Sequence, residues 1–169
     1  MTPVPRLAVL SAFAGALLGA VPILPAAAEV WAACGITTSD TKIVRSFSRY
    51  RAAAQVPYYL AGGTSALVCG DSSYGYRHIK DRHLAEWERD AAVVRSNWRD
   101  HADFAIATTL SDPDRTSYRT RNDTFCFQRL IYLVDRSTGR QVGTRTILVS
   151  VASGFKNVIT AHPTSTGMC

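Results

Sequence analysis

The sequence lacks the motifs that hold metal ions in many small secreted proteins. Its four cysteines include no C-x-x-C pair, and no H-E-x-x-H segment occurs. It also has no cluster of acidic residues that could hold the divalent metal of a typical deoxyribonuclease. A zinc domain, a zinc hydrolase and a metal-dependent deoxyribonuclease are therefore disfavoured, and we expect no metal and no other cofactor.

Long apolar runs are also missing, except for one at the start of the chain. A short beginning with one positive charge precedes an uncharged stretch from Leu7 to Leu24, and Ala26 and Ala28 match the A-x-A pattern of a cleavage site. Residues 1–28 are therefore predicted to be a secretory signal peptide. Residues 29–169 contain no linker or repeat, so we expect a single secreted domain, a monomer with no membrane segment.

Cysteine is scarce, and all four cysteines lie beyond the predicted cleavage site, at Cys34, Cys69, Cys126 and Cys169. An exported chain enters an oxidising compartment, so two disulfides are expected, with three possible pairings. We favour Cys34 with Cys69 and Cys126 with Cys169. Each pair would close one half of the domain, and the second would fix the C-terminal tail.

Lysine is rare as well, since the 19 basic residues include lysine only at Lys42, Lys80 and Lys156. The formal net charge is +6, and it becomes +5 once the single charge of Arg6 is subtracted. An exported, arginine-rich domain favours a polyanionic partner such as nucleic acid. The same charge could simply keep the protein soluble, so charge alone does not decide its function.

Helical spacing of apolar residues dominates the first half of the chain. It predicts helices over Thr41–Gln55, Arg77–Arg95 and Trp98–Leu110, the first capped by Ser39-Asp40 and the third by Asn97. Between the first two, the apolar runs Tyr58–Leu60 and Ala66–Val68, separated by Gly62-Gly63, suit a small hairpin.

From Thr116 onward the period changes to two, and β-branched and aromatic residues take over. Strands are predicted over Thr124–Val134, Gln141–Val151 and Phe155–His162, with turns between them. The result is an α+β fold in which N-terminal helices pack on a C-terminal antiparallel meander. In the last strand, alternation places Lys156, Val158, Thr160 and His162 on one face.

The segment Tyr74–His83 holds two of the four histidines together with two arginines and a lysine. Imidazoles exchange protons near neutral pH, and Arg and Lys hold anions, so this composition favours work on phosphate. His78 and His83 would lie about 140° apart on a regular helix, and both can border one cleft only if His78 is at the helix entrance. The alternative is structural: His83 packs beside Trp87, and His78 only caps the helix.

Further candidates lie in the predicted strands. His162 shares a strand face with Thr160, and Arg129 lies in the middle of an apolar strand, where an arginine is unexpected unless it is paired or faces a cleft. Arg129 is therefore a candidate phosphate ligand.

These residues carry a family resemblance. The run Gly75–His83, with its H-I-x-x-x-H pattern at the start of a helix, then an antiparallel meander and the closing Asn157–Pro163, resembles the toxin ribonucleases of the barnase, EndoU, colicin E5/D and RelE (BECR) group. The resemblance covers roughly residues 66–165. Where members of the group often have an aromatic residue two positions after the threonine of the last strand, this chain has His162.

The resemblance implies metal-independent cleavage of RNA, in which the ribose 2′-hydroxyl attacks the adjacent phosphate and a cyclic phosphate forms. It implies proton transfer by His78 and His83, with His162 able to replace one of them. It further implies phosphate binding by Arg129, Lys80 and Arg82, and an orienting hydroxyl on Thr160. An antibacterial toxin with a separately encoded immunity protein is the expected biological setting. The alternative is a non-catalytic, disulfide-bonded binding module or inhibitor with a basic docking surface.

Overall fold

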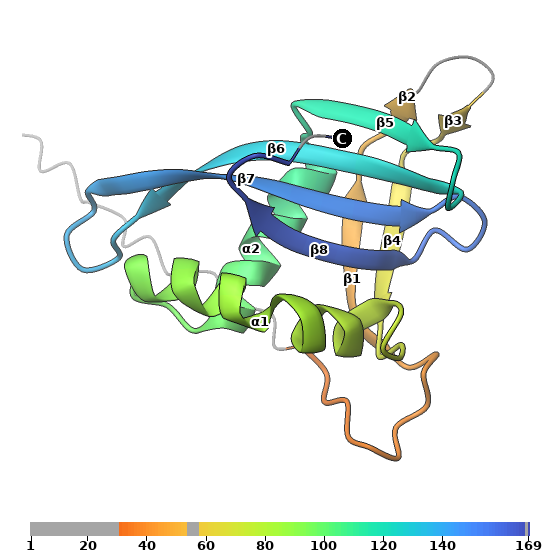
Figure 1. The fold of residues 1–169 in the computed structure, drawn as a ribbon, viewed down its shortest axis with the longest axis horizontal. Coiled ribbons are helices and arrows are strands. Elements are labelled where there is room, and N and C mark those ends of the chain that lie inside the picture. The colour runs from red at the N-terminus through yellow and green to blue at the C-terminus, as the bar shows by residue number, and fades with distance from the viewer. Residues whose placement is uncertain (1–30, 54–57, 168) are drawn as a thin grey trace, which may run out of the picture.

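The computed structural model describes residues 31–53, 58–167 and 169, and the predicted signal peptide lies outside this range. Within the described residues, two helices precede a four-stranded antiparallel sheet, and two short strand pairs come before the helices (Figure 1). The predicted α+β class, with helices followed by a C-terminal meander, is confirmed. None of the helices in these ranges is long and apolar enough to cross a membrane.

The predicted first helix, Thr41–Gln55, is wrong over residues 41–53, and its last two residues lie outside the described part of the chain. Strand β1 (Ile43–Arg49) occupies its centre and pairs antiparallel with β4 (Gly63–Val68). Farther along the same two arms, β2 (Ala52–Ala53) pairs with β3 (Tyr59–Leu60). The two apolar runs predicted to pair with each other are therefore β3 and the end of β4, and both lie on one arm of a longer hairpin.

Burial along β1 explains the error. Val44, Phe47 and Arg49 are buried while Ile43 is 55 % exposed, so the apolar spacing that resembles a helix is that of a strand with an irregularity near its start. The buried Arg49 donates to the hydroxyl of Ser65 at 2.8 Å, which joins the two arms. Pairing with the second arm thus overrides the local helical spacing.

The other two helices form as predicted. Helix α1 runs from Gly75 to Val93, and α2 runs from Trp98 to Ser111. The side chain of Asn97 accepts a hydrogen bond from the backbone N–H of Asp100 at 2.9 Å, so it caps α2 as the sequence predicts.

The C-terminal sheet has the strand order β5-β6-β7-β8. Strand β6 (Thr124–Val134) has the predicted bounds, and β7 (Gln141–Ala152) extends one residue further than predicted. Strand β5 (Arg115–Arg119) adds an edge that the sequence analysis did not assign.

Strand β8 (Val158–Thr164) begins later than predicted, and its register with β7 shifts between Ser150 and Val151. Because of this irregularity, Val158 and Ala161 are both buried, whereas strict alternation would place them on opposite faces. The predicted shared face of Val158 with Thr160 and His162 is therefore wrong. Thr160 and His162, both beyond the irregularity, still lie on one side.

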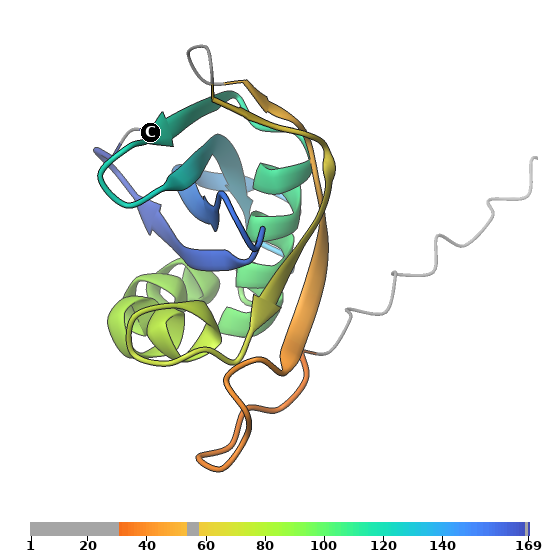
Figure 2. The ribbon, with the colours of Figure 1, turned by 90° about the vertical axis from the view of Figure 1, so that its right-hand side faces the viewer.

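Helix α2 lies between the N-terminal hairpin and the four-stranded sheet, in contact with β1, β6 and β7 (Figure 2). Helix α1 packs against α2 and along the edge strand β8. The largest fully buried side chains come from all three parts and form one core: Trp87, Phe47, Phe127, Leu60 and Ile106 are among them. This arrangement brings α1 and β8, which are far apart in the sequence, side by side.

Both favoured disulfides are present. Cys34–Cys69 joins the segment before β1 to the residue after β4, and Cys126–Cys169 ties the C-terminal residue to β6. The described part of the chain has no free cysteine.

Candidate active site

A tight junction between β4 and α1 places His78 at the helix entrance. Gly70 and Gly75 both have positive φ, 61° and 78°, and a Cβ at Gly75 would lie 2.7 Å from the carbonyl oxygen of Val68. The loop between the two glycines returns to the helix, where Nδ1 of His78 is 2.8 Å from the carbonyl oxygen of Ser72. His78 therefore lies in the first turn of α1, the position that the shared-cleft hypothesis requires.

His83 lies one turn further along α1, half-buried against the sheet. Its Nδ1 is 2.8 Å from Oε2 of Glu86, which is three residues later on the same side of the helix. This contact fixes the orientation of the ring and occupies Nδ1, so that Nε2 is the nitrogen left to act on a ligand.

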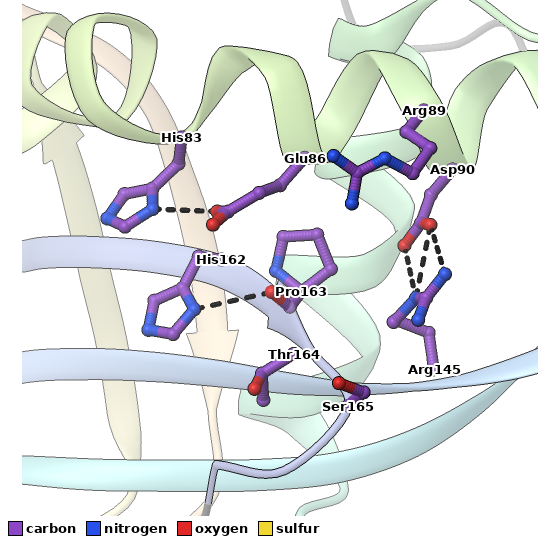
Figure 3. A pocket seen from close by; sticks show the side chains of 9 residues that line it. All are labelled: His83, Glu86, Arg89, Asp90, Arg145, His162, Pro163, Thr164 and Ser165. Atoms are coloured by element: carbon purple, nitrogen blue, oxygen red, sulfur yellow. Dashed lines mark hydrogen bonds and ion pairs between the residues drawn. The ribbon is translucent and has the colours of Figure 1, made fainter.

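Strand β8 supplies the third imidazole. The rings of His83 and His162 are stacked, with centroids 4.6 Å apart and planes inclined by 15°, and Figure 3 shows their Nε2 atoms on the same side. The ring of His78 meets that of His83 edge-on at a centroid distance of 5.6 Å. The fold thus brings together His78, His83 and His162, and His83 faces another imidazole instead of packing only beside Trp87.

The environment of His162 favours its neutral form. Burial is the main cause that lowers its pKa below the ordinary value of 6.5, and the charges of His83 and Arg119 act in the same direction. A hydrogen bond to the carbonyl of Pro163 and the carboxylate of Glu86 oppose this shift without cancelling it. A histidine in this state is able to accept a proton near neutral pH.

A cleft of about 270 Å³ opens beside the stacked rings. It is lined by residues from α1, β7, β8 and the segment after β8: His83, Glu86, Arg89, Asp90, Arg145, His162, Pro163, Thr164 and Ser165 (Figure 3). At its far end the buried carboxylate of Asp90 binds the guanidinium of Arg145, with a shortest distance of 2.7 Å. This ion pair holds α1 to β7 and raises the pKa of Arg145.

Thr160 lies two residues before His162 on β8, on the same side of the strand. Its hydroxyl is buried and has no hydrogen-bond partner among the described residues. A buried hydroxyl without a partner is unusual, because burial removes it from water without replacing the lost hydrogen bond. Thr160 therefore lies next to the three imidazoles of His78, His83 and His162, called the imidazole array below. Its hydroxyl makes no hydrogen bond to a described residue.

The two basic candidates on α1 lie on different flanks of the helix. Arg82 is exposed, one turn after His78 and one turn before Glu86, so it lies on the Glu86 side of the helix without lining the cleft. Lys80 is also exposed, but its six-residue separation from Glu86 places it about 120° away around the helix. Arg82 can reach an anion in the cleft more directly than Lys80 can.

Arg129 does not lie with the histidines and the cleft. On β6 it pairs in register with the buried Ile147, so it points to the sheet face that α2 covers, whereas His162 pairs with Leu148 on the other face. Its guanidinium binds the carboxylate of Asp112 at 2.6 Å and also the backbone carbonyl of that residue. Arg129 is therefore paired with Asp112 at the end of α2, and it lies on the opposite face of the sheet from His162.

The structure adds Glu86, which the sequence analysis passed over. One ligand atom each of His83, Glu86 and His162 lies within 4.8 Å of the others, so these three side chains could hold a metal ion. The search for H-E-x-x-H missed the set because one histidine comes from a distant strand. The signal available in the sequence was an acidic residue three positions after His83.

Comparison with known proteins gives relatives but no function. No family model matches the chain. Two uncharacterized proteins of Mycobacterium tuberculosis, from strains H37Rv and CDC 1551, are each 39 % identical to it over 151 residues, covering 86 % of this chain and 54 % of their own length. The chain therefore spans about half the length of the curated relatives it matches.

Proposed function

We propose that the protein is a secreted, metal-independent endoribonuclease. The observation that carries the proposal is the stacked pair of His83 and His162 beside a cleft. Their Nε2 atoms face the same side, opposite to the Nδ1 atoms that contact Glu86 and Pro163 (Figure 3). Two imidazoles within reach of one phosphate can supply both the base and the acid of a transesterification. The sequence resemblance to the BECR toxin ribonucleases supports the same reaction.

In the proposed reaction, one imidazole takes the proton of a ribose 2′-hydroxyl, whose oxygen attacks the adjacent phosphorus. The bond from phosphorus to the 5′-oxygen of the next nucleotide breaks, and the second imidazole gives that oxygen a proton. The products are a 2′,3′-cyclic phosphate and a free 5′-hydroxyl. We assign the two proton transfers to His83 and His162, and Glu86 holds Nδ1 of His83 so that Nε2 faces the substrate.

The remaining candidates take positions around this pair. Arg89, which lines the cleft, and Arg82, exposed on α1 one turn before Glu86, would bind the phosphates of the RNA and the charge that develops on the reacting one. Thr160 would orient the reacting phosphate only after a movement that exposes its buried hydroxyl, because it does not line the cleft. His78 borders His83 and completes the basic side of the site.

Secretion and an antibacterial role belong to the same proposal. The two disulfides are typical of a protein that folds in an oxidising compartment, as an exported toxin does. A ribonuclease of this kind endangers its own producer, so we also propose a cognate inhibitor protein as a partner.

The test is incubation of the oxidised protein with total RNA in excess EDTA, followed by analysis of the ends. We expect cleavage with cyclic phosphate and 5′-hydroxyl ends. His83→Ala and His162→Ala should each lower kcat/KM by roughly a hundredfold or more, while Arg140→Ala, an exposed change at the β6–β7 turn, serves as the control for folding and purity. Absence of cleavage, together with RNA or protein binding that weakens with salt, would instead favour the non-catalytic binding module.

A further inference from the structure

We propose that His83, Glu86 and His162 form a binding site for a single Zn²⁺ ion. Their nearest ligand atoms already lie within 4.8 Å of one another before any ion is bound. Two of the three, Nδ1 of His83 and Oε2 of Glu86, are only 2.8 Å apart. The site joins two packed elements, α1 and β8, so the fold holds the ligands near one another.

The donor set selects the type of ion. Two imidazoles and one carboxylate suit a borderline ion such as Zn²⁺, which takes three protein ligands and keeps a fourth position for water in its open sites. Mg²⁺ and Ca²⁺ prefer sites made only of oxygen and would gain little from the two histidines. The cleft beside the rings leaves room for a water molecule at the fourth position.

Only side-chain motion is needed to close the site. Ligand atoms of a tetrahedral Zn²⁺ are separated by about 3.4 Å, given bonds of about 2.0–2.1 Å. The most distant pair therefore has to approach by at most about 1.4 Å (4.8 minus 3.4), while His83 and Glu86 move slightly apart. The side chain of Glu86 is 41 % exposed and that of His83 is 19 % exposed, so both have space to rotate.

Binding would displace the proton that His83 shares with Glu86, because the ion takes the lone pair of a ring nitrogen. One negative carboxylate then faces a dication, and among the residues that line the cleft the other acidic side chain, Asp90, is bound to Arg145. We therefore expect a reversible site and not a permanent structural zinc.

The consequence for activity rests on the proposed ribonuclease function. A Zn²⁺ ion held through Nδ1 of His83 would leave the ring proton on Nε2, the nitrogen assigned to proton transfer, so that His83 could no longer accept a proton. The ion would then act as an inhibitor, and activity would return after addition of EDTA. The same side chains would alternate between proton transfer and metal binding.

The test is isothermal titration of tag-free, EDTA-treated and dialysed protein with ZnCl₂. We expect one ion per chain, and His83→Ala, His162→Ala and Glu86→Gln should each weaken binding by at least about tenfold. Two matched controls should bind as the unchanged protein does: Glu88→Gln, an exposed acid on the opposite side of α1, and His78→Ala, the neighbouring histidine outside the ligand set.

Absence of saturable binding, or binding that His162→Ala leaves unchanged, would overturn the site. Equal weakening by the Glu88→Gln control would do the same. The ribonuclease assay is read separately: RNA cleavage without zinc binding overturns only this inference, and zinc binding without RNA cleavage overturns only the proposed function. If both hold, ZnCl₂ should inhibit cleavage at the concentrations that saturate the site.

Discussion

Single side chains decide what the imidazole array can do, and Glu86 is the one with the clearest role apart from the histidines. Its carboxylate contacts Nδ1 of His83 and so selects the tautomer in which Nε2 is the free nitrogen. An amide in its place can accept from the ring or donate to it, so it no longer distinguishes the two tautomers.

We therefore expect Glu86→Gln to lower kcat by about tenfold or more, with KM nearly unchanged, because the substrate-binding arginines remain. Steady-state cleavage of a short fluorogenic RNA measures both constants. Glu88→Gln on the opposite side of α1 is the control. A Glu86→Gln variant with normal kcat, or one that changes only KM, would show that Glu86 does not position His83.

His101 allows a prediction about stability that is independent of activity. It is only 6 % exposed, lies edge-on to Trp87, and its Nε2 has no hydrogen-bond partner among the described residues. Burial is the main cause that lowers its pKa below 6.5; the charges of Arg136 and Arg145 lower it further, and Asp90 opposes them. The folded protein thus holds His101 neutral.

Because the pKa is lower in the folded state, the unfolded chain binds the proton first as the pH falls below about 6.5. The free energy of unfolding should therefore decrease below that pH, by at most about 1.4 kcal/mol per pH unit from this group. His101→Phe should show a smaller loss between about pH 7 and pH 5, measured by urea denaturation at each pH. Parallel curves for the two proteins would contradict a neutral, buried His101.

At the level of the elements, the junction between β4 and α1 determines whether the site forms. Gly70 has a φ of 61°, and a Cβ there would overlap the backbone carbonyl of Tyr74. Gly70→Ala should therefore destabilise the protein by roughly 1–3 kcal/mol or more, since both the conformation and the contact are unfavourable. Gly154→Ala, at a turn where an added Cβ meets nothing within 4 Å, is the matched control.

Chemical denaturation of the Gly70→Ala and Gly154→Ala variants measures this difference in the free energy of unfolding. The Gly70→Ala variant should also lose ribonuclease activity relative to its remaining folded fraction, because a shifted loop changes the entrance of α1, where His78 lies. Equal stability of the two variants would mean that the backbone of the junction adapts at little cost.

The elements also show what a single sequence can and cannot predict. Helices α1 and α2 and strand β6 were predictable because long periodic segments and a side-chain cap act locally. Strand β1 was not, because its pairing partner begins 14 residues after its own end (63 minus 49) and its apolar spacing imitates a helix. The face of Val158, on the other side of the irregularity in β8 from Thr160 and His162, could not be assigned by alternation alone.

The residues of the candidate site also differ in how far the sequence alone predicts them. The segment around His78 and His83 is visible as a local cluster, and Thr160 and His162 could be added from strand alternation. Arg129 looked functional because a charged residue in an apolar strand needs a partner, and the partner turned out to be Asp112 at the end of α2. Which partner satisfies such a residue depends on tertiary contacts that no local pattern contains.

At the scale of the whole molecule, the two disulfides each close a different segment of the chain. Cys34–Cys69 and Cys126–Cys169 close segments of similar length, with sequence separations of 35 and 43. In the chain-entropy account, stabilisation grows only with the logarithm of this length, so the two bonds should differ by only about 0.2 kcal/mol on this ground. Each should contribute about 2–5 kcal/mol to the free energy of unfolding.

We expect the double variants Cys34→Ser/Cys69→Ser and Cys126→Ser/Cys169→Ser to lose similar stability in urea denaturation, because each releases a comparable loop of the unfolded chain. They should differ in activity. The first bond lies directly before Gly70 and the entrance of α1, so its loss should reduce RNA cleavage by the folded protein, whereas the second lies on β6, outside the cleft. A large difference in stability, or a greater loss of activity from the second pair, would show that the C-terminal tail supports the site more than the loop before α1 does.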